Sequence, residues 1–198
     1  MHLLPLALLA TTATAHIVLN LPTSFGFDDD KETTGPCGSF NPMNRTTVTQ
    51  WPINGGAVAV LQADKSANLT FNFLMAASTS NVMIVPAMKI NVAGTGDVCM
   101  PVVAPPASIT SMSGMSTVGM PAVLQVVGET DDGKLYQCAA LAFAAAATTR
   151  PAPPAACKNA TGVKITMLPL PASTSVNMTG GGMTAPPPST GPAKSDDR

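Results

Sequence analysis

Short apolar segments separated by Gly, Pro, Asn and Asp recur along this chain, and they constrain its fold more than any other feature. In the segment Asn68–Met75 an apolar side chain occupies every second position from Leu69 onward, so one face of an extended strand is apolar and most of the other is polar. Residues 163–167 alternate in the same way. Long helical periodicity is absent. The other expected strands are Ile17–Leu21, Ala57–Leu61, Val82–Val85, Val123–Val127 and Leu135–Phe143. This pattern predicts an all-β fold, an immunoglobulin-like antiparallel β-sandwich.

The first fifteen residues have the features of a secretory signal peptide. Leu3–Leu9 is a short apolar core, and the small residues Ala13 and Ala15 stand where a signal peptidase accepts them. This run is shorter than the roughly 20 apolar residues that span a bilayer, and no later segment is long enough. We therefore expect cleavage after Ala15, secretion, and no transmembrane segment. His16 becomes the new N-terminus and, because His2 leaves with the signal, the only histidine.

The C-terminal composition differs from that of the body of the chain. From residue 171 onward Ser, Thr, Pro and Gly dominate, with three glycines at 180–182 and three prolines at 186–188. Such a segment cannot bury enough apolar surface to offset its loss of conformational entropy on ordering. We expect a signal peptide at 1–15, one β-sandwich domain at 16–170 and a disordered tail at 171–198. The sequence shown lacks the apolar C-terminal segment of a lipid-anchor signal.

Cysteines and glycosylation motifs support the secretory route. Four cysteines without CxxC spacing predict two disulfides in one of three connectivities. Four Asn-X-Ser/Thr motifs are candidate N-glycosylation sites. The cysteines are Cys37, Cys99, Cys138 and Cys157, and the motif asparagines are Asn44, Asn68, Asn159 and Asn177.

Composition excludes several functions. Ten basic and 11 acidic residues give a net charge of −1, so the chain has no excess of positive charge with which to bind a nucleic acid. One Trp and one Tyr are too few for a flat carbohydrate-binding face of stacked aromatic rings. With no histidine inside the mature chain, a Ser-His-Asp or Cys-His arrangement requires His16 itself. We therefore expect a protein that is not an enzyme and has no nucleic-acid partner.

An N-terminal histidine is a special ligand. It offers one metal ion both its α-amine and its ring Nδ1, and Cu(II) favours nitrogen ligands in tetragonal geometry. The alternative is that cleavage merely happens to precede a histidine.

Several short motifs occur in an order that is similar to that of a known family. They are His16-Ile-Val-Leu, Gly-Phe-Asp-Asp-Asp-Lys-Glu at 26–32, Gly-Pro-Cys-Gly at 35–38, Trp51-Pro with Gly55-Gly56, Gly-Asp-Val-Cys-Met-Pro at 96–101 and Leu-Tyr-Gln-Cys-Ala at 135–139. Over roughly residues 16–168 the chain resembles the fungal copper-acquisition-factor family, whose members resemble lytic polysaccharide monooxygenases in fold.

That resemblance implies a β-sandwich that binds one Cu(II) through a histidine brace. The brace consists of the N-terminal amine and ring, a second histidine and a carboxylate. It also implies copper handling without polysaccharide oxidation, and a copper importer at the cell surface as a partner.

The metal ligands depart from the family pattern. Aligning Ala57–Val60 on the family's strand puts Asp64 where the second histidine is expected, and Ala139-Ala140 stand where some relatives have an aspartate. The run Asp28–Asp30 could supply a carboxylate, so the expected site consists of His16, Asp64 and Asp28. Two outcomes stay open: a site of two nitrogen and two oxygen donors that holds Cu(II) but suits Cu(I) poorly, or a sandwich without metal, in which 63–66 is an ordinary polar turn.

Methionines offer one further copper hypothesis. Met112, Met115 and Met120 lie in a Ser/Gly-rich loop, where thioethers could hold Cu(I). With 12 methionines in the chain, biased composition explains the cluster equally well.

Three functions follow, in order of preference. The first is a secreted or cell-surface copper-binding protein for copper acquisition. The second is a structural or adhesive extracellular glycoprotein that has lost the metal site, and the third is a copper-dependent polysaccharide monooxygenase.

Overall fold

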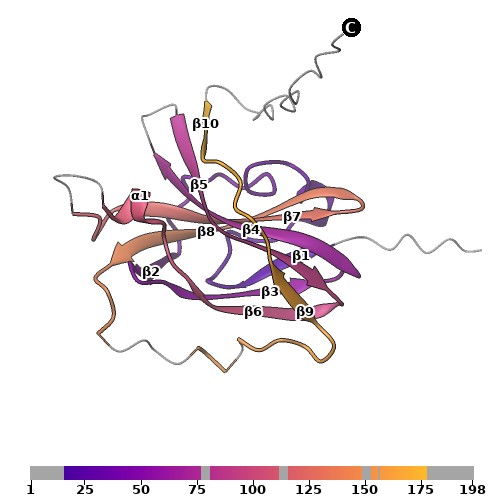
Figure 1. The fold of residues 1–198 in the computed structure, drawn as a ribbon. Coiled ribbons are helices and arrows are strands. Elements are labelled where there is room, and N and C mark those ends of the chain that lie inside the picture. The colour runs from indigo at the N-terminus through magenta and orange to yellow at the C-terminus, as the bar shows by residue number, and fades with distance from the viewer. Residues whose placement is uncertain (1–15, 77–80, 112–115, 149–152, 156, 178–198) are drawn as a thin grey trace, which may run out of the picture.

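The computed structural model describes residues 16–76, 81–111, 116–148, 153–155 and 157–177. Its strands form two sheets that pack face to face, which confirms the predicted all-β sandwich (Figure 1). Short helical turns, η1 (Asp29–Lys31) and α1 (Ala107–Thr110), lie in the connections. No helix among the described residues is long and apolar enough to cross a membrane.

The smaller sheet has three antiparallel strands in the order β1-β3-β6. They are β1 (Ile17–Leu21), β3 (Gly56–Gln62) and β6 (Gly96–Val103). β1 and β3 agree with the sequence prediction, whereas β6 was not expected. Pro101 lies within β6, and proline normally argues against a strand; β6 accommodates it because it lies at the edge of its sheet.

The larger sheet runs in the order β10-β5-β4-β7-β8-β2, and β9 pairs with part of β5. Its strands are β2 (Val48–Pro52), β4 (Ser66–Ala76), β5 (Asn81–Ala93), β7 (Pro121–Thr130), β8 (Gly133–Ala144), β9 (Lys164–Met167) and β10 (Thr174–Asn177). β5 is much longer than Val82–Val85, because a bulge opposite Phe71 and Asn72 lets the strand continue past Pro86.

Two strands of the larger sheet differ from the expectation. The edge strand β2 was not predicted, and it pairs with β8 in parallel, the one parallel pair among the described strands. β10 lies inside the segment expected to be a disordered tail, where Thr174–Asn177 pair with Asn81–Ile84 of β5. Residues 178–198, the proposed signal peptide, Met112 and Met115 lie outside the described residues, whereas Met120 packs against the core.

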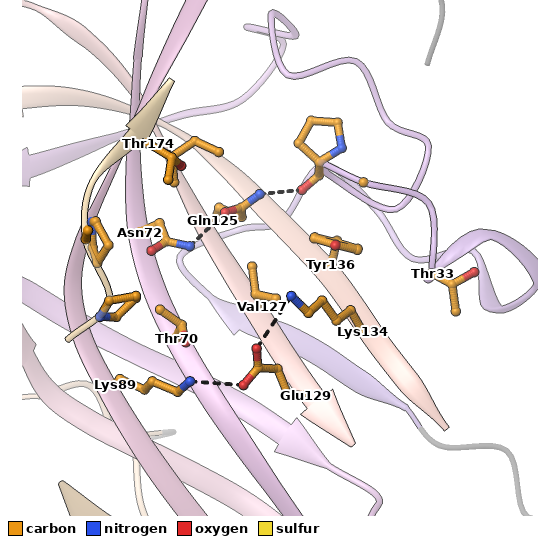
Figure 2. A pocket seen from close by; sticks show the side chains of 16 residues that line it. Thr33, Thr70, Asn72, Lys89, Gln125, Val127, Glu129, Lys134, Tyr136 and Thr174 are labelled. Carbon is orange, nitrogen blue, oxygen red and sulfur yellow. Dashed lines mark hydrogen bonds and ion pairs between the residues drawn. The ribbon is translucent and has the colours of Figure 1, made fainter. Parts of the chain in front are cut away.

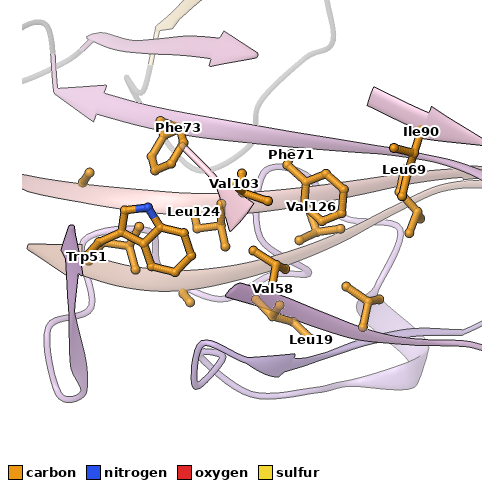
Figure 3. Packing of buried hydrophobic residues seen from close by; sticks show 14 of the residues in the cluster. Leu19, Trp51, Val58, Leu69, Phe71, Phe73, Ile90, Val103, Leu124 and Val126 are labelled. Carbon is orange, nitrogen blue, oxygen red and sulfur yellow. The ribbon is translucent and has the colours of Figure 1, made fainter. Parts of the chain in front are cut away.

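The hydrophobic core fills the space between the sheets (Figure 3). Leu69, Phe71 and Phe73 of β4 are fully buried there, as their alternation predicts, and they meet Leu19 and Val58 of the smaller sheet. The opposite face of β4 is also covered, because Thr70 is only 6% exposed and Asn72 only 5%. On the outer face of the larger sheet, these polar side chains of β4 are therefore covered by other parts of the chain.

Two disulfides are present, as predicted, and their pairing is now defined. Cys37 is joined to Cys138 and Cys99 to Cys157, so all four cysteines are used. The first ties the long loop after β1 to β8. The second ties β6 to the segment before β9.

Candidate metal centre

His16 lies immediately before β1, where the adjoining strand pairing fixes its backbone. The carbonyl of His16 accepts a hydrogen bond from the amide of Ala63 at 3.0 Å, one residue beyond the pairing of Ile17 with Gln62. Ile17 is fully buried against Gly128 of β7, and a Cβ atom at Gly128 would collide with the Ile17 side chain. Gly128 therefore leaves the space into which the side chain of Ile17, the residue next to His16, packs.

The loop of residues 22–47, called here the first loop, leaves β1 and returns to His16. Two backbone hydrogen bonds fix it to β8, from Phe25 N to the Cys138 carbonyl (2.8 Å) and from Tyr136 N to the Glu32 carbonyl (2.9 Å). The Cys37–Cys138 disulfide reinforces them. Gly38 has φ +61°, and a Cβ atom there would lie 2.8 Å from the Tyr136 carbonyl oxygen, so the close approach to β8 requires glycine.

Two carboxylates of the first loop face the His16 ring. Nδ1 of His16 lies 3.0 Å from Oδ1 of Asp29 and 3.4 Å from Oε2 of Glu32. The Asp29 side chain is 54% exposed, whereas that of Glu32 is 1% exposed. Phe27 packs against the His16 ring, and the two rings are perpendicular with centroids 5.5 Å apart.

Glu32 is held in place by the strand that carries the histidine. Its Oε1 accepts a hydrogen bond from the Ile17 amide at 2.8 Å, which leaves Oε2 to face Nδ1 of His16. Burial raises the pKa of Glu32 above its ordinary value, against the lowering effects of the Ile17 hydrogen bond and of His16. Glu32 is thus a buried acid whose charged form needs a positive partner.

Asp64 approaches the same region from the end of β3. Since β3 pairs antiparallel with β1, the residues just after Gln62 lie beside the residue just before Ile17. Oδ2 of Asp64 is buried and has no hydrogen-bond partner among the described residues. Burial raises the pKa of Asp64, as do the nearby carboxylates of Asp132 and Asp131, while His16 lowers it. The histidine is therefore close enough to act on Asp64 electrostatically.

Asp28, the loop carboxylate expected from the sequence, is engaged elsewhere. Its Oδ2 forms an ion pair with Nζ of Lys31 at 2.9 Å. The sequence reasoning did not single out Glu32, although Glu32 stands three residues after Asp29. In a 3₁₀ turn, residues three apart lie on the same side, so a turn predicted at 29–32 would have paired these two acids.

The present arrangement is not a complete metal site. Within the described part of the chain, no group of three or more His, Cys, Asp or Glu side chains is placed so that it could hold a metal ion. In this sequence the nitrogen of His16 is also a peptide amide, because residues 1–15 precede it. Cleavage after Ala15 would add an amine donor beside the imidazole, which lies next to Asp29 and Glu32.

The four glycosylation motifs lie in different environments. Asn159 is exposed, and its Oδ1 accepts a hydrogen bond from Cys99 N at 2.6 Å. Asn44 is partly exposed, and its Oδ1 accepts bonds from the amide and hydroxyl of Thr46. Asn68 lies within β4 between β5 and β7 and accepts a bond from Asn91 at 3.0 Å. The Asn177 side chain lies outside the described part of the chain.

Comparison with known proteins agrees with the resemblance seen in the motifs. A family model described as copper acquisition factor BIM1-like matches residues 14–162, which include His16, the first loop and Asp64. An uncharacterized protein of Aspergillus fumigatus is 31% identical over 161 residues, or 78% of this chain. The chain spans 63% of the length of that relative.

Proposed function

The chain belongs to the BIM1-like copper acquisition factor family, and we propose that it binds Cu(II) through His16 once the signal peptide has been removed. In this proposal it acts outside the cell, in copper acquisition or handling rather than in catalysis, and it passes the ion to a cell-surface importer. The observation that carries the proposal is the placement of the Asp29 and Glu32 carboxylates 3.0 Å and 3.4 Å from Nδ1 of His16.

The donor chemistry of these residues suits Cu(II). The freed amine and Nδ1 of His16 supply two nitrogen donors, and Asp64 and Glu32 supply two carboxylates. An ion held on Nδ1 would meet the carboxylates that now face this atom. Nitrogen and oxygen donors of this kind match a divalent, tetragonal copper ion better than Cu(I), which prefers sulfur.

Each carboxylate has its own reason for inclusion. Oδ2 of Asp64 is a buried acceptor without a partner among the residues that the structure describes, and burial of an unpaired acceptor is costly unless a cation or donor meets it. Glu32 is fixed by the Ile17 amide and excluded from water, so it replaces Asp28 in the proposed ligand set. Asp29 is more exposed, so its side chain can bind the ion or turn away from it.

The N-terminus provides the sharpest test of this proposal. Cu(II) would be titrated by calorimetry and electron paramagnetic resonance into protein that begins at His16, and into a matched form with one additional residue before it. We expect tight 1:1 binding only in the first form, because an added residue turns the amine into an amide. Equal and weak binding by both would refute the copper function and favour a structural glycoprotein.

A second test concerns Asp64. We expect Asp64→Ala to weaken Cu(II) binding and Asp64→His to strengthen it, since imidazole is the better ligand for copper. Asp97→His is the control, because Asp97 is exposed on β6, two strands away from β1. Unchanged affinity in Asp64→His would place Asp64 outside the metal site.

A further inference from the structure

A groove of about 410 Å³ lies on the outer face of the larger sheet, apart from the residues proposed to hold copper. Its floor is formed by β5, β4, β7 and β8, and its sides by the first loop near Pro36 and by the segment that leads into β10 (Figure 2). Ligand pockets range from about 300 to 1,000 Å³. The groove therefore suits a small molecule rather than a folded partner.

Two consecutive hydrogen bonds between amide groups determine which polar atom of the floor is left to face the groove. The Pro36 carbonyl can only accept, so the side-chain nitrogen of Gln125 must donate to it, at 2.9 Å. Oε1 of Gln125 then accepts from Nδ2 of Asn72 at 2.8 Å. This leaves Oδ1 of Asn72 buried, with no hydrogen-bond partner among the described residues.

Asn72 thus requires a donor that the described residues around it do not provide. Its side chain is 95% buried, because only 5% of its surface is exposed, and it lines the groove. Leaving such an acceptor unpaired costs about 1–3 kcal/mol. A ligand with a hydroxyl or N–H group at this point would remove that cost.

The charges at the other end of the groove restrict the ligand further. Lys89 and Lys134 both interact with Glu129, at 3.0 Å and 3.6 Å, so this end carries one more positive than negative charge (Figure 2). A cationic amine is therefore disfavoured as the donor to Asn72. Lys134, whose side chain is 60% exposed, is available to donate to an oxygen of the ligand.

We propose that this groove binds a small saccharide. Hydroxyl groups both donate and accept, so one neutral or acidic sugar can donate to Asn72 and accept from Lys134. Val127 lies between these polar groups in the register of the sheet, and Pro86 lies beside Asn72 on β5, so the C–H faces of a sugar ring can pack against both side chains. The site holds a single small ligand in a groove, and it needs neither a flat aromatic face nor copper.

The experiment is a nuclear magnetic resonance titration of isotope-labelled, copper-free protein. The probes are glucose, mannose, N-acetylglucosamine and glucuronate, with triglycine and ethanolamine as non-saccharide probes. We expect at least one sugar to shift the side-chain amide signals of Asn72 and Gln125. Binding of triglycine or ethanolamine instead, or no shift with any sugar at millimolar concentration, would overturn the proposal.

Two variants test the contacts without depending on one substitution. We expect Asn72→Leu to weaken sugar binding about tenfold or more, and the isosteric Thr70→Val, on the same floor, to weaken it by a smaller factor. Asn91→Leu is the control, since Asn91 is an asparagine of the same sheet, on β5, that does not line this groove. Affinity that is unchanged in both groove variants, or lowered equally in the control, would contradict a saccharide site at Asn72.

Discussion

At the scale of single residues, the proposed copper site depends on Glu32 as much as on His16. The carboxylate of Glu32 links His16 to Ile17, the first residue of β1, because one oxygen accepts from the Ile17 amide while the other faces the His16 ring. This geometry orients the imidazole before any ion arrives. It also places a carboxyl group where water does not reach.

The substitution Glu32→Gln separates these two roles. Glutamine can still accept from the Ile17 amide, but it carries no charge, so we expect Cu(II) affinity to fall about tenfold or more while the fold is retained. Calorimetric titration of protein with a free His16 amine measures the affinity, and thermal unfolding checks the fold. Glu129→Gln removes the same charge from a carboxylate that is paired with two lysines, and it should leave copper affinity unchanged. An equal loss in both variants would mean that only net charge matters.

At the scale of elements, the first loop folds back so that its carboxylates lie beside the His16 ring. It carries Asp29 and Glu32, and it is joined to β8 by backbone hydrogen bonds and by the Cys37–Cys138 disulfide. The second disulfide is attached to the middle of the smaller sheet, where Cys99 pairs with Ala59 and Ala59 with Leu21, the residue of β1 farthest from His16. The two crosslinks therefore stabilise the same domain, but only the first of them fixes the loop that carries the proposed metal ligands.

Removal of each disulfide should distinguish these effects. We expect the paired substitution of Cys37 and Cys138 by alanine to lower the free energy of unfolding by about 2–5 kcal/mol, and also to weaken Cu(II) binding. Substitution of Cys99 and Cys157 should cost stability of similar size but leave copper affinity nearly unchanged. Denaturant unfolding and copper titration measure the two quantities. Equal copper affinity in both double variants would show that the first loop keeps its place without its crosslink.

At the scale of the whole molecule, the sandwich buries the acid Glu32, and partly buries Asp64, as well as apolar side chains. Burial raises the pKa of Glu32 above 4.5 and that of Asp64 above 3.8, their ordinary values. Between the ordinary and the raised pKa, the folded protein holds a proton that the unfolded chain has already released. Stability therefore falls as pH rises through this interval and is constant above it with respect to these groups.

This pH dependence is a property of the copper-free protein. We expect its free energy of unfolding to decrease as pH rises from below 3.8 through the raised pKa values, and we expect the decrease to be smaller in Glu32→Gln and in Asp64→Asn. Chemical denaturation at a series of pH values provides the measurement. A decrease of the same size in the parent and in both variants would assign the effect to other groups.

The sequence by itself determined the all-β fold class, the buried face of β4 and the number of disulfides, because the alternation of apolar residues and the number of cysteines can be read directly from the chain. It also indicated His16 and the family. It did not reveal β2, β6 or β10, since edge strands tolerate proline and polar composition once a neighbour supplies their hydrogen bonds. Only the tertiary structure decided which carboxylates face His16 and which amide oxygen lines the outer groove, because those positions depend on how the first loop folds back onto β8.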